Sequence, residues 1–176
     1  MDGTDDIDVG NGTNRESRIR FRGSIAILNY VGGYRRMSFD AFTRRIPPPT
    51  SINEPAGDWD SIFTQLGTQL PSDYRRFIDA YGTGYLARFY TVANPFSSNR
   101  YVNLFQRLDM IRRSEADSTF FPDAGYAFYP EDDGLIPFML DDNGNDYFWR
   151  TMGEPDDWRL CNASTVALVL LSINCR

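Results

Sequence analysis

Aspartates in the last third of the sequence are the side chains with the clearest potential for chemistry. Residues 131–157 carry nine acidic residues and a single basic one. Two pairs stand out, Asp132 with Asp133 and Asp156 with Asp157, because pairs of carboxylates perform the acid and base steps of glycoside hydrolysis. Acidic residues are far more common in turns between strands, so a carboxylate-based hydrolase is an alternative with little support.

The run from Asp141 to Asp146 resembles a calcium-binding loop in composition but not in spacing. An EF-hand loop requires glycine at its sixth position and a bidentate glutamate at its twelfth. Counted from Asp141, these positions hold Asp146 and Met152. Asn143 and Gly144 form a strong β-hairpin signal instead, because both residue types tolerate positive φ. We therefore predict a hairpin turn here, with no metal site, and we expect no cofactor.

The composition excludes several classes of enzyme. All 18 basic residues are arginine, and the chain has neither lysine nor histidine. Without lysine there is no Schiff-base chemistry and no phosphate-loop lysine. Without histidine there is no Ser-His-Asp or Cys-His pair and no histidine metal ligand. A codon bias toward arginine explains the missing lysine, but the chemical exclusion holds whatever its cause, and we predict no catalytic residue.

Charge is distributed unevenly along the 176 residues, whose net charge is −6. Residues 9–50 contain eight arginines and two acidic residues, whereas residues 131–157 carry a net charge of −8. A dipolar surface of this kind can steer a charged partner, although solvated loops without a partner would give the same pattern. The acidic balance argues against direct binding to nucleic acid, which requires a basic surface.

Cys161 and Cys175 are too few for a disulfide framework in a chain of this length. We expect both thiols to be reduced and buried, which favours the cytoplasm. The first twelve residues lack the cationic and apolar segments of a signal peptide. The longest apolar run, Val166 to Leu171, is far shorter than the ~20 residues that span a membrane. We therefore predict a cytoplasmic protein that contacts no membrane.

Apolar residues at helical spacing predict three helices in the first half of the chain. We expect them at residues 38–46, 58–66 and 71–81. Ser38 and Asp58 are good N-caps for the first two helices. Three prolines stop the first helix, and Gly67 and Gly82 end the second and third.

Strand signals dominate the second half, with one further helix at residues 103–115. We predict strands at residues 85–92, 126–129, 135–140, 147–151 and 158–161, and a final helix at 164–173. Helices followed by a meander of strands indicate an α+β fold. We expect a mostly antiparallel, twisted sheet with helices packed on one side. Residues 1–36 form an N-terminal extension, partly disordered because of its polar composition, and residues 37–176 form the folded domain.

Several of these segments resemble known family signatures. Residues 59–84 contain W-x-x-I, L-G-T-Q-L-P-S-D-Y-R-R-F and Y-G-T-G, and residues 129–158 contain Y-P-E-D-D-G-L-I-P-F, D-N-G-N-D-Y-F-W and G-E-P-D-D-W. In this order and spacing they resemble the SUKH superfamily, which includes Smi/Knr-type regulators of fungal cell-wall synthesis. The resemblance covers residues 37–162. The residues that carry it are Trp59, Leu70, Pro71, Tyr74, Phe77, Tyr81, Gly82, Gly134, Pro137, Gly144, Trp149 and Trp158.

The C-terminus departs from this family, in which a further strand and a helix usually follow. Residues 162–176 are too short for both, so we expect either a missing edge strand, as in a truncated domain, or a terminal helix that packs directly on the sheet. The three tryptophans could stack on a ligand, but their positions on helical and strand stripes favour the core.

In bacteria the resemblance implies an immunity protein of a polymorphic-toxin system, which binds a cognate toxin and performs no chemistry. The toxin is often a nuclease, whose basic site would be attracted to an acidic surface. The candidate contact residues are Asp132, Asp133, Asp141, Asp142, Asp146, Asp156 and Asp157. The alternative is a regulatory or scaffold module of the Smi/Knr type with no toxin partner.

Overall fold

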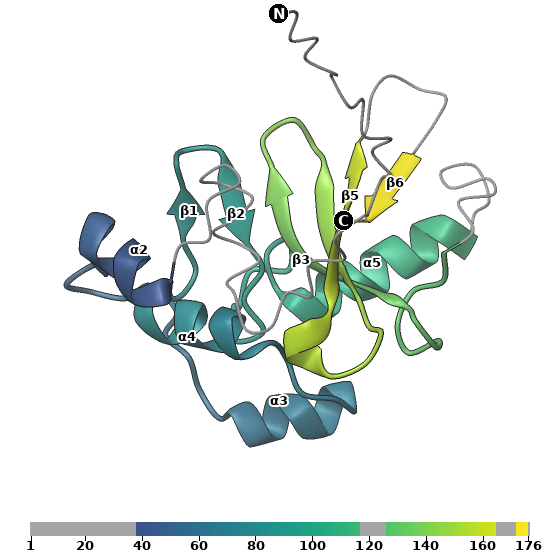
Figure 1. The fold of residues 1–176 in the computed structure, drawn as a ribbon, viewed down its shortest axis with the longest axis horizontal. Coiled ribbons are helices and arrows are strands. Elements are labelled where there is room, and N and C mark those ends of the chain that lie inside the picture. Colours follow the sequence, from purple (N-terminus) through teal and green to yellow (C-terminus); the bar gives the residue numbers. More distant parts are fainter. Residues whose placement is uncertain (1–37, 117–125, 165–171, 176) are drawn as a thin grey trace, which may run out of the picture.

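The computed structural model describes residues 38–116, 126–164 and 172–175 (Figure 1). The predicted N-terminal extension lies outside these ranges. The helices are α2 (Phe39–Arg45), α3 (Trp59–Leu66), α4 (Ser72–Tyr81), α5 (Leu104–Ala116) and the short 3₁₀ helix η1 (Pro155–Asp157). The strands are β1 (Tyr85–Leu86), β2 (Tyr90–Val92), β3 (Leu135–Asp141), β4 (Asp146–Arg150), β5 (Arg159–Ser164) and β6 (Ser172–Cys175).

The six strands form one antiparallel sheet in the order β1-β2-β3-β4-β5-β6. Each strand therefore lies beside its neighbour in the sequence, and Figure 1 shows this meander running from β1 at the left to β6 at the right. The longest hairpin, β3–β4, closes at the Asn143-Gly144 turn, and Gly144 has φ +82°. The predicted α+β fold with an antiparallel sheet is confirmed.

The first three helices begin and end where the sequence predicts. The Ser38 hydroxyl accepts a hydrogen bond from the Ala41 N–H at 3.2 Å, which caps α2. The Asp58 carboxylate accepts from the Asp60 N–H at 3.0 Å and caps α3. Gly67 ends α3 in the left-handed conformation, with φ +83°, which a residue with a Cβ adopts only at a cost.

Side chains from the two faces of the sheet belong to different hydrophobic clusters. Trp149 of β4 and its partner on β5, Leu160, pack with α2, α3 and α4. Phe148 and its partner Cys161 pack with Leu108 and Ile111 of α5. Successive residues of a strand point to opposite faces, so the later part of α5 covers the face opposite the other helices, while Leu104 at its start belongs to the first cluster. The predicted packing of helices on one side therefore holds for α2, α3 and α4 and needs a correction for the later part of α5.

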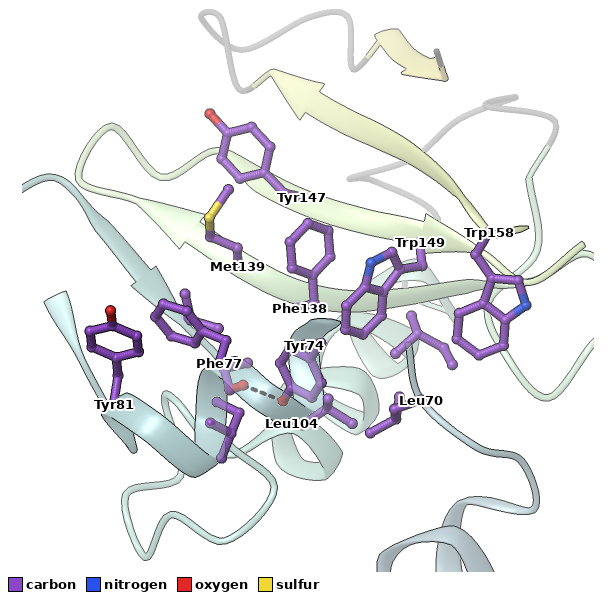
Figure 2. Packing of buried hydrophobic residues seen from close by; sticks show 14 of the residues in the cluster. Leu70, Tyr74, Phe77, Tyr81, Leu104, Phe138, Met139, Tyr147, Trp149 and Trp158 are labelled. Carbon is purple, nitrogen blue, oxygen red and sulfur yellow. Dashed lines mark hydrogen bonds between the residues drawn. The ribbon is translucent and has the colours of Figure 1, made fainter. Parts of the chain in front are cut away.

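An aromatic group forms the centre of the first cluster (Figure 2). Trp149 stacks on Phe138 with ring centroids 4.3 Å apart, and its edge contacts Tyr74 with centroids 4.9 Å apart. The Tyr74 side chain is fully buried, and its hydroxyl donates a hydrogen bond to the Ala93 carbonyl at 2.5 Å. This bond joins α4 to the end of β2, so the cluster locks the helical layer onto the sheet.

Two predicted strands differ from the observed ones. Residues 85–92 form the two short strands β1 and β2, because Ala87 and Arg88 make a turn with positive φ. Residues 126–129 form no strand; Phe128 makes a single parallel bridge to Leu135. Alanine and arginine rarely adopt positive φ, so nothing in the sequence indicated the turn.

The predicted helix at residues 164–173 is wrong at both of its ends. Ser164 belongs to β5, and Ser172 begins β6, while residues 165–171 lie outside the described ranges. A short apolar run does not distinguish a strand from a buried helix by its periodicity. Pairing with β5 decides the conformation of β6, which forms the last strand of the sheet.

The predicted reduced state of Cys161 is also wrong. Cys161 is buried in the second cluster and is disulfide-bonded. Cys175 is the other cysteine of the chain, and the register places it opposite Cys161 across β5 and β6. The two positions meet only because β6 pairs with β5, and a terminal helix would have kept them apart.

Candidate functional site

The seven predicted contact aspartates lie at two opposite ends of the β3–β4 hairpin. Asp132 and Asp133 precede β3, and Asp156 and Asp157 follow β4 in η1. The other three, Asp141, Asp142 and Asp146, surround the turn at the far end of the hairpin. Seven residues of β3 separate the two groups, a distance of roughly 20 Å along a strand. The structure therefore divides the predicted surface into two.

Asp141 organises the β3–β4 turn. Its carboxylate accepts hydrogen bonds from the N–H groups of Asn143 and Asn145 at 3.0 Å, from the Asn145 side chain at 2.8 Å and from the Tyr147 hydroxyl at 2.8 Å. Burial raises the pKa of Asp141, but the hydrogen bonds from Asn145, Tyr147 and Asn143 together outweigh burial and lower the pKa. This buried carboxylate holds the turn in shape and presents little surface to a partner.

The other two turn aspartates also have partners within the domain. Asp146 forms an ion pair with Arg107 of α5, whose side chain is almost fully buried. Arg107 also donates to the Tyr101 carbonyl at 3.1 Å. Burial raises the pKa of Asp146, and the Arg107 charge opposes this effect. Asp142 is exposed and accepts a hydrogen bond from the Tyr85 hydroxyl.

Asp156 caps helix α4 from a distant part of the sequence. Pro71, the N-cap residue of α4, makes no side-chain hydrogen bond to the helix. The Asp156 carboxylate instead accepts from the Ser72 N–H at 2.6 Å. A carboxylate at a helix N-terminus satisfies a free N–H and interacts favourably with the helix dipole. Asp156 therefore contributes to folding, whatever else it contacts.

The end of the sheet near η1 carries a dense group of carboxylates, which we call the acidic end. It consists of Glu131, Asp132, Asp133, Glu154, Asp156 and Asp157, all exposed or half-exposed. Asp133 contacts Arg150 at 3.2 Å. Arg150 and Arg159 are the basic residues at this end of β4 and β5. Carboxylates thus outnumber guanidinium groups three to one.

Four carboxylates of the acidic end are available to a partner. Among the residues that the structure describes, the side chains of Glu131, Asp132, Glu154 and Asp157 make no hydrogen bond or ion pair. They project from turns anchored to buried strands, and Gly134 tightens one of these turns. A Cβ atom on Gly134 would lie 2.5 Å from the Tyr129 nitrogen and 2.6 Å from the Glu131 carbonyl oxygen. The acidic end is therefore a rigidly supported negative surface.

Glu54 is an interacting carboxylate that the sequence analysis missed. Its backbone has φ +50°, and its side chain accepts hydrogen bonds at 2.8 Å from the Thr83 hydroxyl and from the N–H and hydroxyl of Ser98. Hydrogen bonds from Ser97, and then from Thr83 and Ser98, lower the pKa of Glu54 from 4.5 to about 2 against the opposing effect of burial. These bonds join the segment before α3 to the loop after β2.

The stability of the domain should fall between pH 4.5 and pH 2 partly because Glu54 becomes protonated. Its pKa is lower in the folded state, so its contribution is complete above the unfolded pKa and is lost as the pH falls through the folded one. Urea denaturation of the Glu54→Gln variant should show a shallower loss of stability across this range. Glu131→Gln is the control, and an identical slope for Glu54→Gln and wild type would contradict the assignment.

The twelve signature residues form the core and its turns. Ten of them are buried: Leu70, Pro71, Tyr74, Phe77, Tyr81, Gly82, Gly134, Pro137, Trp149 and Trp158. Trp59 is half-buried against the first cluster, where its indole N–H donates to Asp79 at 2.8 Å, and Gly144 forms the exposed β3–β4 turn. Trp149 and Trp158 lie in the core as predicted, and Trp59 packs against its edge. The signature therefore reports how the chain folds.

Among the residues that the structure describes, no group of three or more histidine, cysteine or carboxylate side chains is placed to hold a metal ion. Within the same residues, every helix is too short or too polar to cross a membrane.

Comparison with known proteins identifies the family. The family model SUKH_6, described as SMI1-KNR4 cell-wall, matches residues 57–163. No curated protein and no solved structure matches the chain. The matched residues run from just before α3 to β5 and include the acidic end and the core apart from its α2 residues. The chain belongs to the SUKH superfamily and is a protein-interaction domain of the Smi/Knr type.

Proposed function

We propose that this protein is a bacterial immunity protein, which binds a cognate toxin and neutralises it by covering its active surface. The toxin would carry a basic site, as a nuclease does. No chemical step is needed, because occupation of the site excludes its substrate. The absence of lysine and histidine from the sequence is compatible with a protein that acts in this way.

The acidic end supports this proposal most directly. Four carboxylates without partners in the described part of the domain project from two adjacent turns, and the underlying strands hold both turns in place. Opposite potentials across an interface accelerate encounter and select the partner. The hairpin-turn aspartates contribute less to such a surface, because Asp141 and Asp146 are occupied by hydrogen bonds within the domain.

We further propose that binding occurs in the cytoplasm, where a nuclease toxin finds its substrate. The disulfide of Cys161 counts against this location, because disulfides are rare in the cytosol.

Survival of cells that produce both proteins in the cytoplasm tests function and location together. Where a toxin gene lies immediately upstream, cells that make this toxin should survive only when they also make the wild-type domain. Death of cells that contain the folded domain would contradict the immunity proposal. The alternative, a Smi/Knr-type module that has no toxin partner, would then remain.

Charge reversal at the acidic end should weaken toxin binding. The variant Asp132→Arg with Asp157→Arg changes two carboxylates that contribute no hydrogen bond to the described structure. We expect a loss of about 10–100-fold in affinity at low salt, mainly through slower association, and a smaller difference at high salt because ions screen the surface. Isothermal titration and stopped-flow kinetics with the purified toxin measure both effects.

The matched control carries the same change in net charge elsewhere. Asp40→Arg with Asp109→Arg alters exposed residues of α2 and α5, whose ion pairs to Arg76 and Arg113 lie on the surface and contribute little stability. Affinity of this control should stay within a few-fold of wild type. Equal affinity of the acidic-end variant and wild type at low salt would exclude the acidic end as the contact surface.

A further inference from the structure

The turn between β1 and β2 adopts an unfavourable backbone conformation. The Phe89 N–H donates to the Leu86 carbonyl at 3.0 Å and closes a turn with Ala87 and Arg88 at its centre. Their φ angles are +51° and +54°. A turn with positive φ at both central residues normally contains Asn-Gly, because other side chains crowd the backbone there. Ala87 and Arg88 therefore form a strained turn at positions where Asn-Gly would form an unstrained one.

Backbone hydrogen bonds hold the turn, but the side chains of its two central residues add no contact with the described residues that offsets the strain. Glu54 also has positive φ, but its carboxylate makes several hydrogen bonds that hold it in place. Ala87 and Arg88 are both exposed, and the Arg88 guanidinium makes no hydrogen bond or ion pair with any residue that the structure describes. Non-glycine residues held in such conformations cluster at functional sites, so the turn points to a role in recognition.

Hydrogen bonds to Asp142 fix the residues on both sides of the turn. The Asp142 N–H donates to the Phe89 carbonyl at 3.1 Å, which fastens the turn to the neighbouring β3–β4 turn. The Tyr85 hydroxyl donates to the Asp142 carboxylate, although 52 % of the Tyr85 side chain is exposed. Both turns lie at the top of Figure 1. Tyrosine and arginine are the residue types that most often dominate binding energy at interfaces.

We propose that Arg88 and Tyr85 form a second contact for the toxin, one that takes a carboxylate of the toxin beside an apolar group. This inference rests on the proposed immunity function. The guanidinium offers paired N–H donors that match a carboxylate, and the immobilised tyrosine ring offers apolar area without loss of side-chain freedom. The turn lies at the end of the sheet opposite the acidic end, so a toxin that contacts both must reach along the length of β3, roughly 20 Å.

Two variants of the turn separate its strain from its recognition. Ala87→Gly relieves strain and keeps Arg88, whereas Ala87→Asn with Arg88→Gly installs the favourable turn and removes the arginine. Thermal unfolding should show a higher midpoint for both variants than for wild type. Titration with the purified toxin from the co-expression experiment should show wild-type affinity for Ala87→Gly and at least a tenfold loss for the double variant.

The outcomes distinguish this inference from the function on which it rests. A double variant that binds the toxin as tightly as wild type would overturn the Arg88 contact and leave the immunity function intact. An unchanged or lower unfolding midpoint for Ala87→Gly would show that the wild-type turn is not strained. This result would overturn the inference without any measurement on the toxin. Failure of the wild-type domain to bind this toxin would overturn both proposals.

Discussion

The Gly82→Ala variant should lose about 3–5 kcal/mol of its free energy of unfolding, from strain and overpacking together. A Cβ atom at this position would lie 2.2 Å from the Asn53 carbonyl oxygen, 2.5 Å from the Ile52 side chain and 2.9 Å from the Glu54 carbonyl oxygen. Two of these neighbours are backbone atoms, which cannot move aside as a flexible side chain can. The φ of +62° and ψ of −142° add strain, because residues with a Cβ almost never adopt this combination.

The close approach at Gly82 has a structural purpose. The Gly82 N–H donates to the Ile78 carbonyl at 2.8 Å and ends α4, while the next N–H, that of Thr83, donates to the Asn53 carbonyl at 2.9 Å. Gly82 and Asn53 form a bridge between segments on either side of α3 and α4. The same segments are joined by the Glu54 carboxylate, so loss of this approach should loosen both connections.

Urea denaturation followed by circular dichroism measures the effect, with Gly144→Ala and Gly153→Ala as controls. Both control residues have positive φ, but no atom lies within 4 Å of a Cβ placed on either of them. They should lose about 1–2 kcal/mol through the backbone conformation alone. A Gly82→Ala variant no less stable than these controls would show that the approach of Asn53 is not required.

The Trp149→Ala variant should lose about 3–5 kcal/mol, as removal of large buried aromatic side chains usually does. Only 1 % of the Trp149 side chain is exposed. Its ring contacts Phe138 on β3, Tyr74 on α4 and Trp158 after η1, so its loss would leave a cavity between the sheet, α4 and the segment after η1 (Figure 2). Residues in close contact cannot all move in to fill such a space.

Trp149→Phe is the matched comparison, because phenylalanine retains a ring that can stack on Phe138. It should lose clearly less stability than alanine. Differential scanning calorimetry of both variants gives the comparison, and the midpoint of Trp149→Ala should be the lower by several degrees. Equal stabilities of the two variants would contradict a role for aromatic stacking at this position.

Local patterns explain why the helices could be predicted. The caps at Ser38 and Asp58 and the glycines at 67 and 82 act within one or two turns of the helix, so short stretches of sequence contain all the necessary information. The Asn143-Gly144 turn is equally local. The signature that indicated the SUKH superfamily was readable for a related reason, because its residues are the large apolar and glycine positions that fill the core.

The candidate surface required the folded chain. Spacing placed seven aspartates in one acidic stretch, but only the hairpin geometry separates Asp132 and Asp157 at one end from Asp141 and Asp146 at the other. Whether a carboxylate is free depends on partners far away in the sequence, such as Arg107 for Asp146 and Ser72 for Asp156. Composition reports the charge of a stretch and leaves its partners undetermined.

The sequence by itself determined the helices and their caps, the β3–β4 hairpin, the superfamily and the excess of acidic over basic residues, because each depends on neighbouring residues or on composition. Only the tertiary structure decided the face covered by α5, the strand conformation of β6 with the pairing that brings Cys161 opposite Cys175, and the positive φ of Ala87 and Arg88. The position of α5 and the pairing of β6 depend on contacts between separate segments, and the turn at Ala87 and Arg88 depends on the pairing of β1 with β2, so pairing and packing outweigh local preference.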